Sequence, residues 1–298
     1  MKEIQSIAKV IFIVTILFIS KNSIASPQLP DYVIYKGDTI PVYNLILEQY
    51  FKTVSKPDQG SLFGLKFRDG ASFNCWRGYQ AIYSIENDSL FLNEIITCGE
   101  LYNNKPLNQE DSKNRIQDIF GDSYKNNKVF VDWYSGKFSL PNGNLLRWDG
   151  VFHKIFEKEI LIQVGNGTIN RISYINNYED NPTRVNRRYQ DTISNVLFKE
   201  LEKFKWKKID KFDPSEIYLV TIGENGKVSN VSMVEYQVRD SIKKYWDRNE
   251  YKYCIRSVRK ALKDLNFDII KKDGEPIEEK VIFEIWLGED GKLKNWTY

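Results

Sequence analysis

The sequence predicts an α+β protein, in which an antiparallel β-rich N-terminal domain precedes a small β-α-β domain. Between Ser26 and Asn181, short β-prone segments alternate with turn signals. Beyond this region, strand pairs with Asn-Gly and Asp-Gly turns enclose the clearest amphipathic helix of the chain. The 298 residues are 42% hydrophobic, enough for packed cores. At about 100–200 residues per domain, the length suggests two domains.

Residues 1–25 have the pattern of a secretory signal peptide. Lys2 and Lys9 provide a positive start, an apolar run of ten residues spans 10–19, and Ser23-Ile24-Ala25 provides small residues for cleavage. A bilayer-spanning helix needs about 20 apolar residues, twice this run. We therefore expect cleavage and a periplasmic or secreted protein. The alternative is an inner-membrane anchor formed by residues 8–25.

The predicted N-terminal domain spans residues 26–181. Helical spacing of apolar residues predicts helices over 39–51 and 113–120. The turn signals Glu86-Asn87-Asp88 and Gly165-Asn166-Gly167 each separate two β-prone runs, which predicts two hairpins. The predicted strands are 62–67, 79–85, 89–96, 129–140 and 160–175.

The predicted C-terminal domain spans residues 182–298, after a polar segment that contains Pro182. It is net basic, whereas residues 26–181 are net acidic. We expect helices over 191–204 and around 254–265, and strands over 217–222, 228–234 and 280–287. The sequence Gly223-Glu224-Asn225-Gly226 is nearly repeated at Gly288-Glu289-Asp290-Gly291, which we interpret as two similar hairpin turns.

This C-terminal domain resembles the C-terminal domain of TonB, particularly its Bacteroidetes versions. The resemblance rests on residues 220–228, 254–262, 272–277 and 281–285, in that order. It implies a β-α-β domain whose edge strand accepts an extended peptide from an outer-membrane receptor, so we expect an envelope protein or peptide partner. The implied strand is 280–287, with Phe283 and Ile285 as binding residues. An ordinary sheet edge protected by charges is the alternative.

The chain departs from the TonB pattern in three respects. Residues 26–181 are globular rather than Pro-rich, the hydrophobic leader looks cleavable, and the aromatic-proline motif before the first strand is replaced by Ile209-Asp210-Lys211-Phe212-Asp213-Pro214. A TonB-like energy transducer is therefore expected only if the leader remains as an anchor.

Two aromatic motifs mark the N-terminal domain: Cys75-Trp76-Arg77-Gly78-Tyr79 and Asp132-Trp133-Tyr134-Ser135-Gly136. They are similar to motifs of a bacterial domain of uncharacterised function. An Arg among aromatic rings can form a stacking platform for a glycan or peptide. The predicted binding residues are Trp76, Arg77, Tyr79, Trp133 and Tyr134. The alternative is that the rings fill a small core and Arg77 pairs internally.

The cysteines and the single histidine limit the available chemistry. Cys75 and Cys98 can form a disulfide in an oxidising compartment, although the sequence leaves their pairing open. Cys254 lies on the apolar face of a predicted helix, which favours a buried thiol. One histidine, His153, excludes a zinc site with two or more histidines. No nucleotide-binding, zinc or nucleophile motif occurs, so we expect no cofactor or metal. The net charge of +3 does not indicate nucleic-acid binding.

These observations predict a non-enzymatic, exported envelope protein that binds a peptide or protein partner. The first alternative is a carbohydrate-active enzyme of the N-terminal domain, which would use a carboxylate pair such as Glu157 and Glu159. Glu278 and Glu279, which are adjacent in the sequence, form a second such pair. The other alternative is a purely structural pair of domains, expected if residues 293–298 cover the edge of the last strand.

Overall fold

The computed structural model describes residues 28–54, 71–102, 107–149, 153–234 and 247–297. Its fold is mixed α+β, with sheets predominating, which confirms the predicted class. The chain divides into two compact units, Met1–Tyr134 with Asp149–His153, and Ser135–Trp148 with Lys154–Tyr298. The predicted domain boundary after residue 181 lies within the second unit. The signal peptide and the strand predicted over 62–67 lie outside the described residues.

The first unit is built on strands β1 (Asp31–Tyr35), β2 (Asp38–Val42), β3 (Gln80–Glu86), β4 (Ser89–Ile96) and β5 (Val129–Phe130). Their order is β2-β1-β3-β4-β5. The pairing is antiparallel except between β1 and β3, which run parallel. The expectation of an entirely antiparallel sheet was therefore wrong at this pair. The β3–β4 hairpin turns at Asn87 and Asp88, which both adopt the positive φ that a two-residue turn requires.

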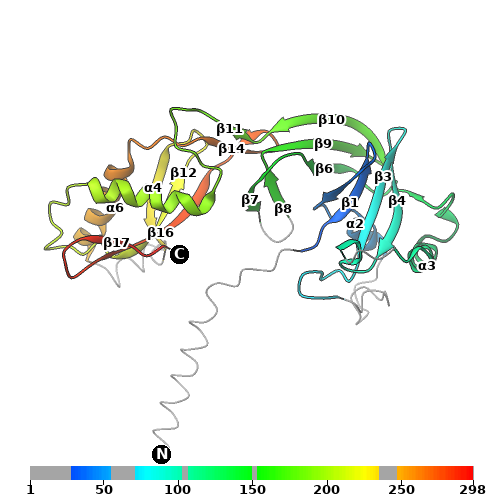
Figure 1. Cartoon of the computed structure of the whole chain (residues 1–298), viewed down its shortest axis with the longest axis horizontal. Coiled ribbons are helices and arrows are strands. Elements are labelled where there is room, and N and C mark those ends of the chain that lie inside the picture. The colour runs from blue at the N-terminus through cyan, green and yellow to red at the C-terminus, as the bar shows by residue number, and fades with distance from the viewer. Residues whose placement is uncertain (1–27, 55–70, 103–106, 150–152, 235–246, 298) are drawn as a thin grey trace, which may run out of the picture. The chain divides into compact units, whose positions relative to one another are not determined.

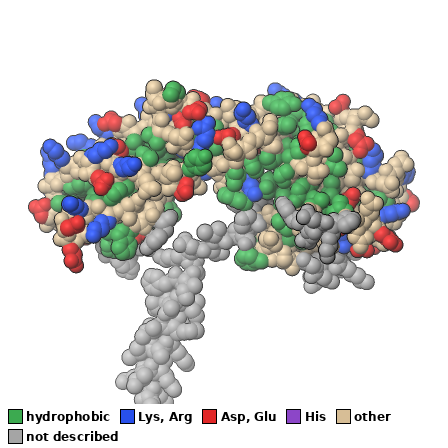
Figure 2. All heavy atoms as spheres, in the orientation of Figure 1, with side chains coloured by type: hydrophobic (Ala, Val, Ile, Leu, Met, Phe, Trp, Pro, Cys, Tyr) green, Lys and Arg blue, Asp and Glu red, His purple; other side chains and the backbone are tan. Residues whose placement is uncertain are grey.

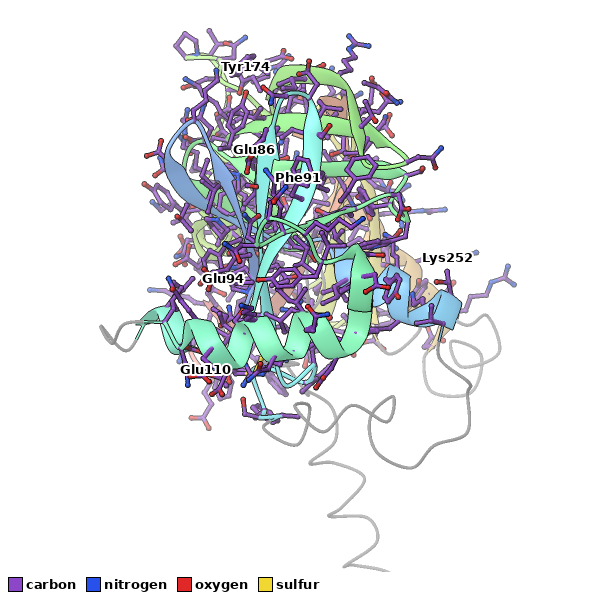
Figure 3. The ribbon with its side chains drawn as sticks, turned by 90° about the vertical axis from the view of Figure 1, so that its right-hand side faces the viewer. Glu86, Phe91, Glu94, Glu110, Tyr174 and Lys252 are labelled. Carbon is purple, nitrogen blue, oxygen red and sulfur yellow. A yellow bond between two sulfur atoms is a disulfide. The ribbon has the colours of Figure 1, made fainter. Side chains whose placement is uncertain are left out.

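Two helices accompany this sheet (Figure 1): α2 (Ile46–Val54) and α3 (Gln109–Phe120). The helix predicted over 39–51 was wrong in its first part, since residues 38–42 form β2. Pro41 lacks an N–H group, and an edge strand tolerates that loss. Asn108 caps α3 by accepting a hydrogen bond from the Asp111 amide. Figure 3 shows α3 crossing the end of β4 close to Glu94.

Packing of α3 on β4 includes polar contacts to one strand residue. The Ile95 amide donates to Ser112 Oγ at 2.9 Å, and the Arg115 guanidinium donates to the Ile95 carbonyl at 2.9 Å. At the other end of β4, Lys128 pairs with Glu86 and lies 4.3 Å from the centroid of the Phe91 ring. Glu86 and Phe91 lie together in this part of the sheet (Figure 3).

The second unit begins with antiparallel strands β6 (Gly136–Pro141), β9 (Lys158–Gly165) and β10 (Thr168–Asn176), in the order β10-β9-β6. The β9–β10 hairpin turns at Asn166-Gly167, as predicted. The strand predicted over 129–140 is interrupted, because the Tyr134 amide turns back to the Val131 carbonyl. β7 (Leu145–Asp149) pairs with β8 (His153–Phe156), and β11 (Tyr178–Glu179) pairs with β14 (Ile269–Lys272), which also pairs with β15 (Glu275–Pro276).

The C-terminal part of this unit is a sheet in the order β13-β12-β16-β17. Its strands are β12 (Glu216–Ile222), β13 (Val228–Met233), β16 (Glu279–Leu287) and β17 (Leu293–Asn295). Helices α4 (Ile193–Lys203) and α6 (Arg248–Leu262) pack with it around one core (Figure 1). Short 3₁₀ segments complete the described elements at Glu100–Tyr102, Gly121–Ser123 and Gln190–Thr192. We call residues 193–297 the C-terminal module; Figure 2 shows basic and acidic side chains interspersed over its visible face.

The two Gly-rich turns of the C-terminal module have the same hydrogen bonds. Gly223 N donates to the Lys227 carbonyl and Gly226 N to the Gly223 carbonyl; Gly288 and Gly291 repeat this pattern. Their surroundings differ, because a Cβ on Gly226 would lie 2.1 Å from the Phe267 carbonyl oxygen, whereas nothing lies within 4 Å of one on Gly291. Gly226 is therefore required for close backbone packing, and Gly291 only for its positive φ.

Candidate functional site

The Cys-Trp-Arg-Gly-Tyr motif turns its polar side chains into the first unit. The Arg77 guanidinium donates to Asp31 Oδ1 at 2.7 Å and to the Leu29 carbonyl at 2.8 Å, and both charged side chains are buried. The Tyr79 hydroxyl donates to Glu48 Oε1 at 2.6 Å, and burial raises its pKa well above the usual value. The motif thus connects its loop to β1 and α2.

This geometry corrects the expectation of a stacking platform around Arg77. A platform needs ring and guanidinium faces that reach solvent, but Arg77 is 5% exposed and Tyr79 is 1% exposed. Trp76 differs, because its side chain is among the exposed large hydrophobic groups of the chain. The arrangement agrees with the alternative in which Arg77 pairs internally.

The second aromatic motif also packs inward. The Trp133 ring stacks on Phe120 of α3 with centroids 5.1 Å apart and lies 4.9 Å from Tyr50 of α2. Its indole N–H donates to the Ile46 carbonyl at 3.3 Å. Tyr134 is buried, which raises its pKa to about 12. The motif therefore joins α2 and α3, and Tyr134 offers no exposed ring to a ligand.

The cysteines differ in their environments. Cys75 and Cys98 form a disulfide with Cα atoms 6.1 Å apart. Cys254 is a free thiol in the core of the C-terminal module, and burial raises its pKa to about 12. Since the thiolate is the nucleophilic form, this environment opposes thiol catalysis.

Strand β16 has one buried and one exposed face. Phe283 and Ile285 are fully buried in the core that the sheet shares with α4 and α6. Their side chains therefore cannot contact a partner, which corrects their assignment as binding residues. Side chains alternate along a strand, so the intervening residues face outward: Ile282 is 56% exposed and Trp286 is 45% exposed.

The outward face of β16 carries an aromatic pair. The rings of Trp286 and Trp296 lie 5.6 Å apart, and both are exposed. The Trp286 indole N–H donates to Glu284 Oε1 at 2.7 Å, which fixes the ring on this face. Leu219 of β12 stands opposite Ile282 in the register and adds a half-buried apolar group. We call Leu219, Ile282, Trp286 and Trp296 the outer apolar face.

The edge of β16 that faces away from β12 is covered along one half of the strand. β17 pairs with Ile285, Trp286 and Leu287. Beyond it, the Trp296 amide donates to the Glu284 carbonyl at 3.0 Å, and the Glu284 amide donates to Thr297 Oγ1 at 2.8 Å. Residues 293–297 thus cover the C-terminal half of the edge, which is part of what a purely structural role would require.

The other half of this edge is open within the described part of the chain. Both backbone groups of Glu284 point away from β12, and in an antiparallel ladder this direction repeats every second residue. The backbone N–H and C=O groups of Lys280 and Ile282 therefore point the same way. Their outward groups have no hydrogen-bond partner among the described residues. This open edge, together with the outer apolar face, is the candidate binding site.

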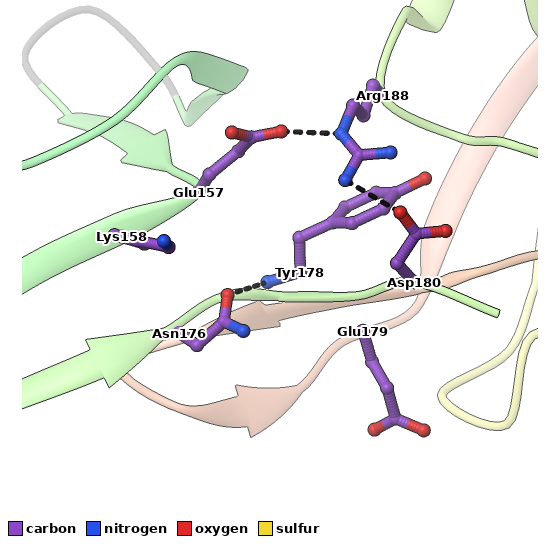
Figure 4. A pocket seen from close by; sticks show the side chains of 7 residues that line it. All are labelled: Glu157, Lys158, Asn176, Tyr178, Glu179, Asp180 and Arg188. Carbon is purple, nitrogen blue, oxygen red and sulfur yellow. Dashed lines mark hydrogen bonds and ion pairs between the residues drawn. The ribbon is translucent and has the colours of Figure 1, made fainter.

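A separate polar pocket of about 360 Å³ lies in the second unit (Figure 4). Arg188 is one of its lining residues: the guanidinium donates to Glu157 at 2.6 Å and to Asp180 at 3.0 Å, and lies 4.1 Å from the centroid of the Tyr178 ring. Arg188 therefore binds both Glu157 and Asp180, whereas the third carboxylate of the lining, Glu179, pairs with Lys271 at 3.2 Å. The pocket is lined by Glu157, Lys158, Asn176, Tyr178, Glu179, Asp180 and Arg188.

The two carboxylate pairs considered for catalysis have separate structural roles. Glu157 binds Arg188, whereas Glu159 is buried, accepts a hydrogen bond from the Phe156 amide and has a pKa raised by burial. Glu279 pairs with both Arg147 and Arg187 in a largely buried cluster. Neither pair presents two free carboxylates to one cleft, as glycoside hydrolysis requires.

Arg147, Arg187 and Glu279 form a connection that sequence inspection missed. Arg147 lies on β7 and Glu279 begins β16, so 132 residues separate the two partners. Arg147 also donates to the Arg187 carbonyl at 2.7 Å. A sequence pattern covers only neighbouring residues, so nothing in the sequence indicates a contact between residues this far apart. The contact is seen only in the folded structure, where these charged groups are largely buried together.

No family model matches the chain, and comparison with curated proteins and with solved structures finds no match. Along the described residues, no helix has the length and apolarity needed to cross a bilayer. In the same residues, no group of three or more His, Cys, Asp or Glu side chains is placed to hold a metal ion.

Proposed function

We propose that this protein is an exported, non-enzymatic envelope protein that binds an extended segment of a peptide or protein partner. The partner adds a strand beside Lys280 and Ile282 of β16. The observation that carries the proposal is the set of outward backbone groups on these two residues, next to exposed apolar side chains. Strand addition uses such groups for affinity and the neighbouring side chains for specificity.

The backbone groups alone do not account for tight binding. Two residues offer four groups, and each hydrogen bond contributes about 0.5–1.5 kcal/mol net. A Kd of 1 μM needs about 8 kcal/mol, on top of the entropy lost on association. The outer apolar face must therefore contribute: Ile282 lies on the open half of the edge, and Trp286 is exposed further along the same face of β16.

The order of elements supports the TonB-C-like reading of this module. β12, β13, α6 and β16 occur in this order along the chain, with the short strands β14 and β15 between α6 and β16, and the sheet order is β13-β12-β16. This is the strand, strand, helix, strand order that the resemblance implies. We propose the binding mode of that family without its energy transduction, since a Pro-rich spacer is missing from the sequence.

The experiment screens a library of extended peptides against the full chain and two variants of one residue. Ile282→Pro removes an outward N–H that β12 does not use, whereas Ile282→Ala keeps it and shortens only the side chain. We expect peptides selected on the wild type to bind Ile282→Pro at least tenfold more weakly, with a smaller loss for Ile282→Ala. Equal binding to all three chains, or no binder at all, would contradict the proposal.

A further inference from the structure

A run of exposed lysines connects α4 to β12 in the C-terminal module. Asp210 is the only acidic residue of segment 204–212. Just before this segment, Lys203 pairs with Glu200 at 2.7 Å, whereas the lysines within it form no ion pair with a carboxylate among the described residues. We call these exposed lysines the lysine patch: Lys205, Lys207, Lys208 and Lys211.

The segment that carries the lysine patch is fixed against α6 by aromatic side chains. The Trp206 indole N–H donates to the Leu201 carbonyl at 3.2 Å, and the Trp206 and Phe212 rings lie 6.4 and 5.3 Å from the ring of Tyr253 on α6. The Tyr253 hydroxyl accepts a hydrogen bond from the Lys208 amide at 3.0 Å. A segment held in this way loses little conformational entropy when its exposed groups bind a ligand.

Part of the lysine patch lies on a single helical turn. The amides of Lys211 and Phe212 both donate to the Lys208 carbonyl, at 3.1 and 2.9 Å. Residues three and four apart share one side of such a turn, and the ammonium groups of Lys208 and Lys211 lie 5.9 and 5.5 Å from the centroid of the Phe212 ring. Like charges at this spacing repel each other. A bound anion would remove the repulsion that the fold leaves unbalanced.

The chemistry of the lysine patch favours a ligand with several negative charges along a flexible chain. Runs of Lys on a surface form patches for polyanions such as nucleic acids and acidic polysaccharides. Single-stranded nucleic acids also need exposed rings on which their bases stack. None of the rings around the patch is among the exposed large hydrophobic side chains: Phe204, Trp206, Phe212 and Tyr253. The export that belongs to the proposed function also favours a glycan, because nucleic acids are held in the cytoplasm.

We propose that the lysine patch binds an acidic polysaccharide, through ion pairs between its ammonium groups and acidic groups on successive sugars. A Lys ammonium is a point charge on a flexible stem, so it can follow acidic groups whose spacing varies along a chain. Single ion pairs on a surface are weak, and binding therefore depends on several lysines that act on one polymer.

The test measures binding of the full chain to polygalacturonate at several NaCl concentrations, with its methyl ester as the uncharged reference. One variant combines Lys205→Gln, Lys207→Gln, Lys208→Gln and Lys211→Gln. The control variant loses the same charge by changing four exposed lysines elsewhere to Gln: Lys113, Lys125, Lys292 and Lys294.

We expect the wild type to bind polygalacturonate but not the methyl ester, and to bind more weakly as the salt concentration rises. The variant of the lysine patch should bind weaker by about tenfold or more and depend less steeply on salt, because fewer charges take part. The control variant should stay within about twofold of the wild type, since local charges dominate at moderate ionic strength.

Three results would overturn the inference. The first is no binding of polygalacturonate at low salt. The second is an equal loss in both variants, which would show that net charge attracts the polymer. The third is tighter binding of a single-stranded DNA with the same number of charges. Circular dichroism of each variant checks the fold, and the outcome is independent of strand addition because β16 and the lysine patch share no residue.

Discussion

The loop of residues 72–78 in the first unit and strand β16 both place a buried side chain directly beside an exposed one, but for different reasons. In the loop, Trp76 is exposed while Arg77 turns inward to a buried carboxylate. In β16, Ile282 is exposed and Phe283 buried because side chains alternate along any strand. In a strand, alternation of side chains therefore predicts which residues share a face, whereas a loop has no regular alternation from which burial could be predicted.

The largest effect is expected for Arg77→Ala. The substitution leaves Asp31 buried without its cation, and breaking a buried ion pair from one side costs about 3–5 kcal/mol. The neighbouring control, Trp76→Ala, should cost clearly less, because the Trp76 side chain carries no buried charge and is 42% exposed. Denaturant unfolding of both variants measures the difference, and equal destabilisation would contradict the assigned burial.

A similar contrast is expected in β16. Phe283→Ala should cost about 3–5 kcal/mol of stability, because it empties part of a closed core. Ile282→Ala should cost much less, since its side chain is 56% exposed. If urea unfolding gives the reverse order, the register of β16 assigned above is wrong.

Substitutions in the two Gly-rich turns are expected to destabilise the fold by an intermediate amount. Gly226→Ala should destabilise by clearly more than Gly291→Ala, because its Cβ would meet the Phe267 carbonyl oxygen at 2.1 Å. For Gly291→Ala only the positive φ opposes the change, at about 1 kcal/mol. Thermal unfolding followed by circular dichroism compares them; identical melting temperatures would refute the close approach.

The smallest expected effect on stability is the contribution of Glu159 to the pH dependence of the free energy of unfolding. Burial raises the pKa of Glu159, so the folded state binds its proton more tightly than the unfolded chain does. The stability contribution of this group is therefore highest below its unfolded pKa and falls as the pH rises through its folded pKa. We expect Glu159→Gln to flatten the fall in stability that begins as the pH rises above the ordinary Glu pKa of about 4.3. Parallel profiles for wild type and variant would contradict the shift.

Cys254 provides a chemical test of burial that needs no mutation. Its pKa of about 12 predicts negligible alkylation by iodoacetamide at pH 8 in the folded protein and rapid alkylation after unfolding in urea. Mass spectrometry measures the modified fraction. Fast labelling of the native protein would show that the thiol is not enclosed in the core of the C-terminal module.

The sequence was most informative where structure is local. Asn166-Gly167 and Asn87-Asp88 marked two hairpins, and alternation marked β16. It was least informative where distant residues meet: Asp31 lies 46 residues from Arg77, and Arg147 lies 132 residues from Glu279. The motif containing Arg77 thus suggested a ligand site, because nothing beside it in the sequence indicates its internal carboxylate partner.

For the candidate site, the sequence predicted the strand correctly but not the side chains that are exposed on it. The strand of interest was identified correctly as an element, since β16 spans the predicted residues 280–287. The side chains chosen on it, Phe283 and Ile285, were those of the buried face. Residues 293–297 pair with only part of β16, and where this pairing ends decides which half of the edge is open. The turn at Gly288 indicated that the chain pairs back on β16, but not how many residues pair.

The most direct measurement is amide hydrogen exchange, by NMR, of the full chain without any ligand. If the edge is open, the amides of Lys280 and Ile282 exchange rapidly, while that of Glu284, bonded to Thr297 Oγ1, exchanges more slowly. Adding a peptide selected on the wild type should then slow the exchange at Lys280 and Ile282. Slow exchange at these two amides in the free protein would mean that the edge is already covered, and would contradict strand addition at β16.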